Sequence, residues 1–268
     1  MGIKAEGVSK LYETAGKRRQ VLAVDGIDLE VDEGEFVALV GPSGCGKSTF
    51  LYMVGGFISP SSGRILVDGR AVTAPGTDRG IVFQEFALFP WKTVLDNVMY
   101  GLQEKGLRRK EAEATARRYL EMTNLQAFER VYPKELSGGM KQRVAIARTL
   151  AYDPKVLLMD EPFGALDAQT RVIMQDELLR VWQGTQKTVL FVTHSVEEAI
   201  HLADRVVIFT ARPGRIKEIV PVDLPRPRSR EIELFDRRYA ELTSRIWRAV
   251  EEEVKKSMEL RAATGVAP

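Results

Sequence analysis

The chain has 268 residues, with 39 lysines and arginines against 37 aspartates and glutamates, two histidines and a single cysteine. This length accommodates one large domain, or a domain with a subdomain, and a sizeable core. The near balance of charge gives no reason to expect a nucleic-acid partner. One cysteine excludes an internal disulfide and indicates a reducing, cytosolic compartment.

The apolar runs are short, such as residues 156–159 and 206–209, whereas a membrane-spanning helix needs about 20 residues. The first residues lack the apolar stretch of a signal peptide. We therefore expect any association with a membrane to come through a partner protein.

The first third of the chain predicts β-structure around one helix. Apolar and acidic side chains largely alternate over residues 24–31, which is typical of a half-buried strand. Residues 36–40 are continuously apolar and predict a strand buried on both faces. A helix is expected over 49–57, followed by strands at 64–68 and 80–84.

Residues 93–151 predict a helical subdomain, because charged, alanine-rich segments such as 108–122 are typical of surface helices and no strand pattern separates them. Strand and helix patterns then alternate, with strands at 156–159, 189–193 and 205–209 and helices at 170–183 and 196–203. This alternation indicates βαβ units, so we predict an α/β fold with the helical subdomain inserted between two halves of a parallel sheet.

The C-terminal part divides the chain into residues 1–220 and 221–268. Residues 221–230 are rich in Pro and Arg and predict a linker. Apolar residues then recur every three or four positions, namely Ile232, Phe235, Tyr239, Leu242, Ile246, Val250 and Val254. This spacing predicts one amphipathic helix that packs on another surface.

Residues 41–48 match the phosphate-loop pattern G-x-x-x-x-G-K-[ST] between a predicted buried strand and a predicted helix. The glycines allow backbone N–H groups to approach phosphate oxygens, and the helix directs its positive end at the same anion. Lys47 is expected to reach the β- and γ-phosphates, and the Ser48 hydroxyl to bind Mg²⁺. The nucleotide-binding residues expected here are Gly41, Pro42, Ser43, Gly44, Cys45, Gly46, Lys47, Ser48 and Thr49.

Cys45 lies inside this loop and allows two interpretations. A helix N-terminus lowers a thiol pKa, so Cys45 is a candidate redox switch. The alternative is a small residue that fits a crowded loop, and we favour it.

Asp160 and Glu161 end the apolar strand at 156–159. Two carboxylates at such a strand end are either solvated or engaged with a metal or substrate, and the phosphate loop favours the second reading. We expect Asp160 to steady Mg²⁺ and Glu161 to polarise the attacking water. His194, after the strand at 189–193, is a candidate γ-phosphate contact, since ligands sit at the carboxyl ends of parallel strands. Gln84 also ends a predicted strand and is a weaker candidate for Mg²⁺ or the attacking water.

The chain resembles the ATP-binding cassette ATPases over residues 1–220, because their motifs occur here in the family's order. They are Tyr12, the phosphate loop, Gln84, the signature LSGGM at 136–140, Asp160 with Glu161, Asp167 in the D-loop and His194. Met140 stands where many members carry Gln. The resemblance implies a P-loop NTPase (RecA-like) core with a mixed, largely parallel sheet, an antiparallel β-subdomain and an inserted α-helical subdomain.

The resemblance also implies how these residues act. Tyr12 would stack on adenine, and ATP with Mg²⁺ would lie between two copies in a head-to-tail homodimer. Each ATP would meet the phosphate loop of one copy and Ser137, Gly138 and Gly139 of the other, with the helix at 141–150 directing its positive end at the γ-phosphate. Asp167 would lie near the same contact.

The sequences at 80–84, 88–91 and 211–216 resemble the nitrate, sulfonate and taurine importer branch of the family. This implies a peripheral subunit on the cytoplasmic face of the inner membrane, driving a transmembrane permease that a solute-binding protein supplies. The aromatic segment 84–91 is expected to dock on the permease, although packing within the helical subdomain is an alternative. Two other functions stay open: a soluble ATPase acting on nucleic acid or the ribosome, and the motor of an exporter.

Overall fold

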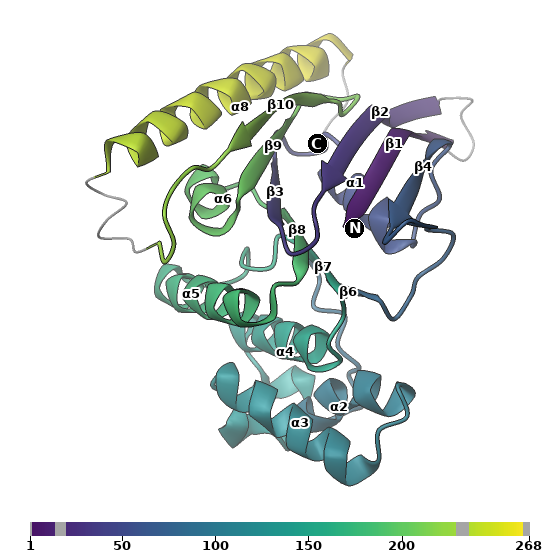
Figure 1. Ribbon diagram of the computed structural model, residues 1–268, viewed down its shortest axis with the longest axis vertical. Coiled ribbons are helices and arrows are strands. Elements are labelled where there is room, and N and C mark those ends of the chain that lie inside the picture. The colour runs from purple at the N-terminus through teal and green to yellow at the C-terminus, as the bar shows by residue number, and fades with distance from the viewer. Residues whose placement is uncertain (1, 14–19, 229–235, 265–268) are drawn as a thin grey trace. The chain divides into compact units, whose positions relative to one another are not determined.

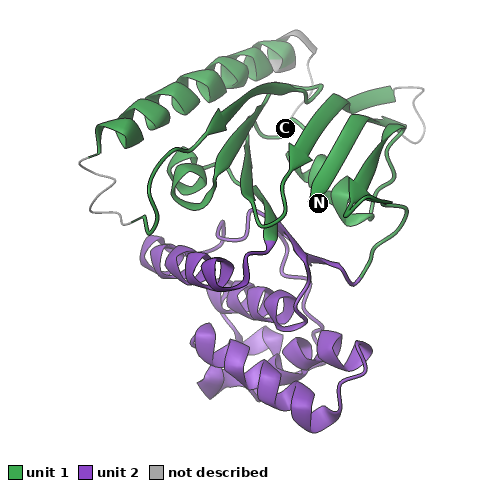
Figure 2. Cartoon of the chain, in the orientation of Figure 1, with its two compact units in different colours: residues 1–76, 188–268 green, residues 77–187 purple. Residues whose placement is uncertain are grey.

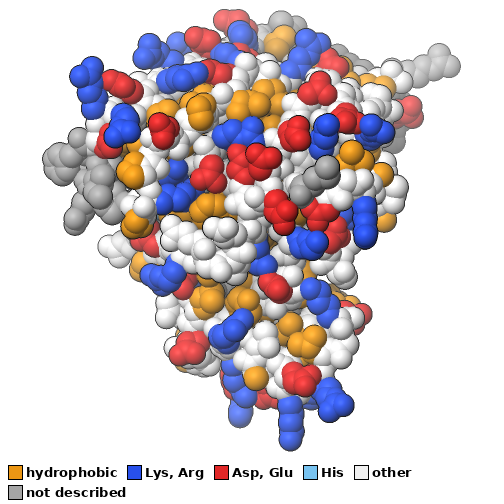
Figure 3. All heavy atoms as spheres, viewed as in Figure 1, with side chains coloured by type: hydrophobic (Ala, Val, Ile, Leu, Met, Phe, Trp, Pro, Cys, Tyr) orange, Lys and Arg blue, Asp and Glu red, His pale blue; other side chains and the backbone are white. Residues whose placement is uncertain are grey.

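The computed structural model describes residues 2–13, 20–228 and 236–264 (Figure 1). The chain divides into two compact units, residues 1–76 with 188–268 and residues 77–187 (Figure 2). The second unit, residues 77–187, covers a longer stretch of the chain than the helical subdomain expected at 93–151. No helix in the described part of the chain is long and apolar enough to cross a membrane. On the face shown in Figure 3, basic and acidic side chains are interspersed.

The first unit contains an antiparallel sheet with the strand order β2-β1-β4-β5. Its strands are β1 (Ile3–Glu13), β2 (Gln20–Val31), β4 (Ser62–Val67) and β5 (Arg70–Ala71). In β2 the apolar Ile27, Leu29 and Val31 are buried, whereas Asp28 and Glu30 between them are exposed. The alternation in the sequence therefore matches a sheet with one buried face.

The same unit contains a second group of strands, which are mostly parallel. They are β3 (Phe36–Val40), β8 (Thr188–Val192), β9 (Arg205–Phe209) and β10 (Ile216–Pro221). β3 pairs in parallel with β8 on one side and with β9 on the other, and β10 pairs antiparallel to β9. Every residue of β3 and β8 is buried, which explains their continuously apolar sequences.

Among its described residues the first unit has three α-helices: α1 (Lys47–Gly55), α6 (Val196–Leu202) and α8 (Arg237–Thr264). α1 begins and ends two residues earlier than predicted. It ends there because Gly56 adopts φ 78° and its N–H bonds to the carbonyl oxygen of Met53, which closes the last turn.

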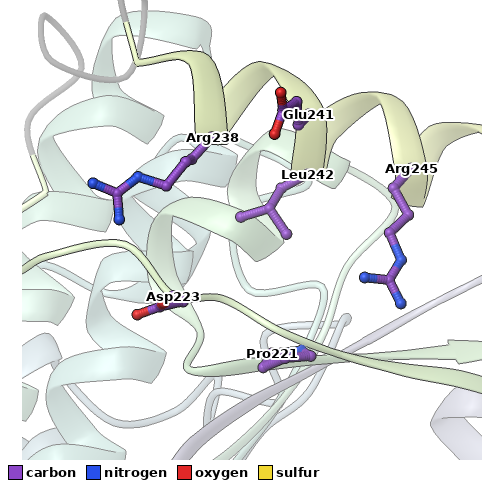
Figure 4. A pocket seen from close by; sticks show the side chains of 6 residues that line it. All are labelled: Pro221, Asp223, Arg238, Glu241, Leu242 and Arg245. Atoms are coloured by element: carbon purple, nitrogen blue, oxygen red, sulfur yellow. The ribbon is translucent and has the colours of Figure 1, made fainter.

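Helix α8 lies beside α6 and the β9–β10 pair (Figure 1). Ile246 and Ala249 are buried, and the indole N–H of Trp247 donates to Glu197 of α6 at 3.1 Å. Ile232 and Phe235 of the predicted apolar stripe lie outside the described residues. Near the start of α8, Leu242 and Arg245 point toward the end of β10 across a pocket (Figure 4).

The Pro/Arg-rich segment after β10 is bound to the end of α6. Arg228 is buried, and its guanidinium donates to the carbonyl oxygens of Ile200, His201 and Ala203. Cations at a helix C-terminus satisfy carbonyls that have no partner within the helix. The described part of this segment, up to Arg228, is therefore fixed on the first unit.

The second unit contains two parallel strands and four α-helices. They are β6 (Arg79–Val82), β7 (Val156–Asp160), α2 (Val94–Glu104), α3 (Arg109–Met122), α4 (Gly138–Ala151) and α5 (Ala168–Thr185), with 3₁₀ turns at Gln126–Phe128 and Pro133–Glu135. β6 ends at Val82, so Gln84 lies in the loop after the strand, not at its last position as predicted.

Candidate active site

The loop between β3 and α1 has the backbone shape of an anion cradle. Gly46, directly before α1, adopts φ 105°, and an added Cβ would lie 2.7 Å from the carbonyl oxygen of Ala23, so only glycine fits. The first turn of α1 holds no acidic residue, and no side chain caps it. The positive end of α1 is therefore available to an anion in the loop.

Lys47 is the buried cation of this loop, with 4% of its surface exposed. Its ammonium donates to the carbonyl oxygens of Gly41 and Pro42 at 2.8 and 2.9 Å and lies 3.6 Å from Cys45 Sγ. All three partners are neutral. A buried ammonium among neutral groups is costly, and an added phosphate would offset that cost. The loop therefore suits an anion such as a phosphate group, and Ser48 and Thr49 follow Lys47 on the first turn of α1.

The Cys45 side chain is 1% exposed. Burial raises the pKa of its thiol, against a smaller lowering effect of the Lys47 ammonium. The thiolate, which is the reactive form, is therefore disfavoured. This environment supports the second of the two interpretations, a small residue that fills the loop.

We expect Cys45 in the folded chain to react with a disulfide reagent such as DTNB at least about tenfold more slowly than in the urea-unfolded chain, because its thiol is buried and protonated. It is the only cysteine, so absorbance of the released thiolate reports this residue alone. Prompt, complete labelling of the folded chain would restore the redox interpretation.

The loop between β9 and β10 backs the phosphate loop. Gly214 pairs with β2, because its N–H donates to the carbonyl oxygen of Ala23 at 2.9 Å and its own carbonyl oxygen accepts from the N–H of Asp25 at 3.0 Å. An added Cβ at Gly214 would overlap the carbonyl oxygen of Cys45, and Arg212 Nε donates to the carbonyl oxygen of Gly44 at 3.3 Å. In the sequence, residues 211–216 resemble a motif of the importer branch, but that pattern did not predict the contact of this loop with the phosphate loop.

Two further predicted residues lie at the surface of the first unit. His194 is exposed between β8 and α6, in a turn whose next residue, Ser195, caps α6 by accepting from the N–H of Glu198 at 3.1 Å. Tyr12, near the end of β1, is 38% exposed, and the Lys10 ammonium lies 5.3 Å from its ring centroid. Both side chains are accessible to a ligand.

The second unit brings Gln84 and Glu161 together. The Gln84 amide donates to a Glu161 carboxylate oxygen at 3.3 Å. Asp160 is the buried last residue of β7, and Glu161 after it adopts φ 47°, a strained conformation for a residue with a side chain. No group of three or more His, Cys, Asp and Glu in the described ranges is placed to hold a metal. A metal bound here would therefore also need hydroxyl, amide or nucleotide oxygens as ligands.

The signature residues form the start of α4. Ser137 caps this helix, because its hydroxyl accepts from the N–H of Met140 at 3.3 Å. The helix therefore begins at Gly138, three residues earlier than predicted, and its first turn holds no acidic residue. Asp167 caps α5 in the same way, and the hydrogen bond from the Thr170 N–H lowers the pKa of its carboxyl.

Sequence reasoning missed two residues that shape the aromatic segment after Gln84. The Asn97 side chain is fully buried; it accepts from the N–H of Phe89 at 2.8 Å and donates to the carbonyl oxygens of Phe89, Lys92 and Thr93. Arg148 donates to the carbonyl oxygen of Ala87 at 2.6 Å. A buried Asn within α2 has no distinctive local pattern, so these backbone contacts were not predictable.

Residues 24–164 match the family model described as ABC transporter. The chain belongs to the ABC transporter family. This membership confirms the resemblance drawn from the ordered motifs and makes the chain an ATP-binding cassette with ATPase activity.

Relatives match the ABC cassette over most of its length. An uncharacterized ABC transporter ATP-binding protein of Methanocaldococcus jannaschii is 54% identical over 257 residues, covering 96% of this chain and 94% of the relative. The nitrate import ATP-binding protein NrtD of Synechocystis sp. is 53% identical, covering 78% and 79%. The aliphatic sulfonates import ATP-binding protein SsuB of Bacillus cereus is 45% identical, covering 88% and 92%.

A solved structure of a dimeric bacterial ABC transporter cassette superposes with a TM-score of 0.76 at 33% identity, covering 83% of this chain and 100% of that one. A dimeric cassette in a post-hydrolysis state with ADP and phosphate gives a TM-score of 0.75 at 32% identity, with the same coverage. The predicted fold, a P-loop NTPase core with an antiparallel β-subdomain and an α-helical subdomain, is thereby confirmed.

Proposed function

We propose that this cassette is the ATP-hydrolysing subunit of a membrane importer for a small anion of the nitrate or sulfonate class. The observation that carries the proposal is the likeness to NrtD and SsuB, at 53% and 45% identity over 78% and 88% of this chain. The cassette would work on the cytoplasmic face of the membrane, attached to a permease that a solute-binding protein supplies.

ATP binding is assigned chiefly to the first unit. The phosphate loop holds the triphosphate through its backbone N–H groups and Lys47, whose neutral partners support this role. The exposed ring of Tyr12 stacks on adenine. Mg²⁺ would be held by Ser48, Asp160 and Gln84, and it would neutralise charge that develops on the phosphates.

Hydrolysis is assigned to Glu161 as general base, because its carboxylate accepts a proton from the attacking water. The Gln84 amide, 3.3 Å from that carboxylate, orients it. His194 is assigned to the γ-phosphate, as its exposed position in the turn before α6 allows.

Two copies are proposed to assemble head to tail around two ATP molecules. Each copy would offer Ser137, Gly138 and Gly139 at the start of α4 to the nucleotide on its partner, with Asp167 beside the contact. The absence of acidic residues in the first turn of α4 favours an anion there, and the similar solved cassettes are dimeric.

The permease is proposed to dock on the segment after Gln84. Trp91 is 70% exposed, and the Phe89 ring beside it packs on Tyr100 with a centroid distance of 4.7 Å. Asn97 and Arg148 hold the backbone of this segment. A large exposed aromatic on a fixed loop is typical of a protein contact site.

Replacing Trp91 with Ala is expected to reduce recovery of the permease with the tagged cassette by at least about tenfold, since a central aromatic contributes about 2 kcal/mol or more to an interface. The measurement is copurification from detergent-solubilised membranes. Phe128→Ala, an exposed aromatic elsewhere in the same unit, is the matched control. Undiminished recovery with Trp91→Ala would place the docking site elsewhere.

The transport function is tested by expressing the cassette with the permease and solute-binding protein encoded beside it and reconstituting them in proteoliposomes. We expect ATP-dependent uptake of nitrate or of an alkanesulfonate. Export of solute, or ATPase activity that responds to nucleic acid and not to the permease, would contradict the proposal.

A further inference from the structure

Glu253 is the most deeply buried carboxylate of α8, with 2% of its surface exposed. Its two oxygens have different partners. One accepts from the backbone N–H of Ala211 at 3.0 Å, and the other lies 3.0 Å from the Lys217 ammonium and 2.6 Å from that of Lys256. Although burial opposes ionisation, the hydrogen bonds from Lys256, Ala211 and Lys217 lower the pKa of Glu253 below its ordinary value.

Ala211 is the second residue of the loop between β9 and β10, which backs the phosphate loop. The next residue, Arg212, donates to the carbonyl oxygen of Gly44, and Gly214 lies so close to Cys45 that no side chain fits between them. Phe209, the last residue of β9, lies close to Gly41, where an added Cβ would be 2.9 Å from the Phe209 carbonyl oxygen. A shift of this loop is therefore transmitted to the phosphate loop at Gly44 and Cys45.

We propose that Glu253 is a positioning residue for the nucleotide site: by binding the N–H of Ala211, helix α8 holds residues 210–215 against the phosphate loop and thereby sets the affinity for ATP. The proposal rests on the phosphate-binding role assigned to residues 41–48. It gives the C-terminal helix a function in the ATP cycle, although none of its residues is expected to touch the nucleotide.

Helix α8 contacts the rest of the first unit at several points, among them Arg245 with Glu218 of β10 and Trp247 with Glu197 of α6, and Glu253 is the contact that reaches the loop at Ala211. Near its start the helix faces β10 across a pocket lined by Arg238, Leu242 and Arg245 (Figure 4). Further along, Lys217 of β10 donates to the carbonyl oxygen of Ala249 at 3.0 Å, and Glu253 reaches past β10 to the loop.

Glu253→Gln is the sharpest variant, because it changes charge without creating a cavity. If the amide oxygen of Gln accepts from Ala211, the amide NH₂ group faces two ammonium groups. If the oxygen faces the ammonium groups, the NH₂ group meets the N–H of Ala211. Either orientation leaves donors opposed in a buried site.

Glu252→Gln is the matched control. Glu252→Gln removes the same charge, and Glu252 also binds Lys217, at 2.7 Å. Its side chain, however, is 65% exposed, and in the described part of the chain its ion pair is with β10 and not with the loop backing the nucleotide. A difference between the two variants therefore reports the Ala211 contact and not the net charge of α8.

The experiment measures ATP affinity of the full chain by fluorescence titration with a labelled ATP, together with hydrogen–deuterium exchange. Glu253→Gln is expected to raise the Kd for ATP by about fivefold or more and to speed exchange at residues 41–47 and 211–215, whereas Glu252→Gln stays within about twofold of the unaltered chain. Equal ATP affinities for the two variants, or faster exchange confined to 211–215, would overturn the proposal.

A second measurement needs no variant. Because coupling between two sites is reciprocal, ATP binding to the unaltered chain is expected to slow exchange at residues 249–256 as well as at 41–47. Slower exchange at 41–47 alone would overturn the proposal even if Glu253→Gln fails to fold. Lys47→Ala distinguishes the role of the phosphate loop from the role of α8. Normal ATP affinity in Lys47→Ala contradicts the assignment of the phosphates to residues 41–48. Weakened ATP affinity in Lys47→Ala, together with unaltered affinity in Glu253→Gln, contradicts only the role of α8.

Discussion

Replacing Glu161 with Gln is expected to lower the rate of ATP hydrolysis by about 10²- to 10⁴-fold while ATP still binds. An amide cannot accept the proton of the attacking water, but it has nearly the same size as the carboxylate. Gln84 lies 3.3 Å from Glu161, and its contact can persist if the new amide turns its oxygen toward it. Phosphate release under saturating ATP measures the effect on turnover, and titration with ATP measures binding.

The same variant is expected to accumulate as a dimer in ATP, because closure needs bound ATP and opening needs hydrolysis. Size-exclusion chromatography with and without ATP measures this shift. Glu85→Gln, an exposed carboxylate in the same loop as Gln84, is the matched control and should keep its ATPase rate. Hydrolysis by Glu161→Gln at the unaltered rate would show that another group is the base.

The strands that are buried on both faces were predictable, because such burial requires a nearly continuous apolar sequence. Residues 36–40, 156–160 and 188–192 are buried throughout, and each is an almost unbroken apolar run. The helix ends were less predictable, since they depend on single capping groups. Ser137 moves the start of α4 three residues toward the N-terminus, and Gly56 ends α1 two residues early.

The candidate site was predictable where its functional residues are consecutive in the sequence, as in the phosphate loop and the pair Asp160 and Glu161. It was not predictable where a side chain binds a backbone group far away in the chain. Glu253 and Ala211 are 42 positions apart. A backbone N–H is present at nearly every residue, so no local pattern identifies the one that a buried carboxylate will bind.

Replacing Lys47 with Ala is expected to weaken ATP binding by roughly 10- to 100-fold, since a hydrogen bond to a charged group contributes about 1.5–3 kcal/mol. Without nucleotide, the ammonium is held by the carbonyl oxygens of Gly41 and Pro42, which are neutral acceptors. Its removal therefore breaks no ion pair with these groups and relieves the cost of a buried charge, so the fold is expected to be retained.

Isothermal titration of the full chain with ATP and with ADP measures this effect, and circular dichroism checks the fold. The loss should be larger for ATP than for ADP, because Lys47 is assigned to the β- and γ-phosphates and ADP has no γ-phosphate. Lys110→Ala, which replaces an exposed lysine on α3, controls for the loss of one positive charge.

Equal losses of affinity for ATP and ADP would confine the contact of Lys47 to the β-phosphate. Unchanged affinity for both nucleotides would contradict the assignment of the phosphates to residues 41–48.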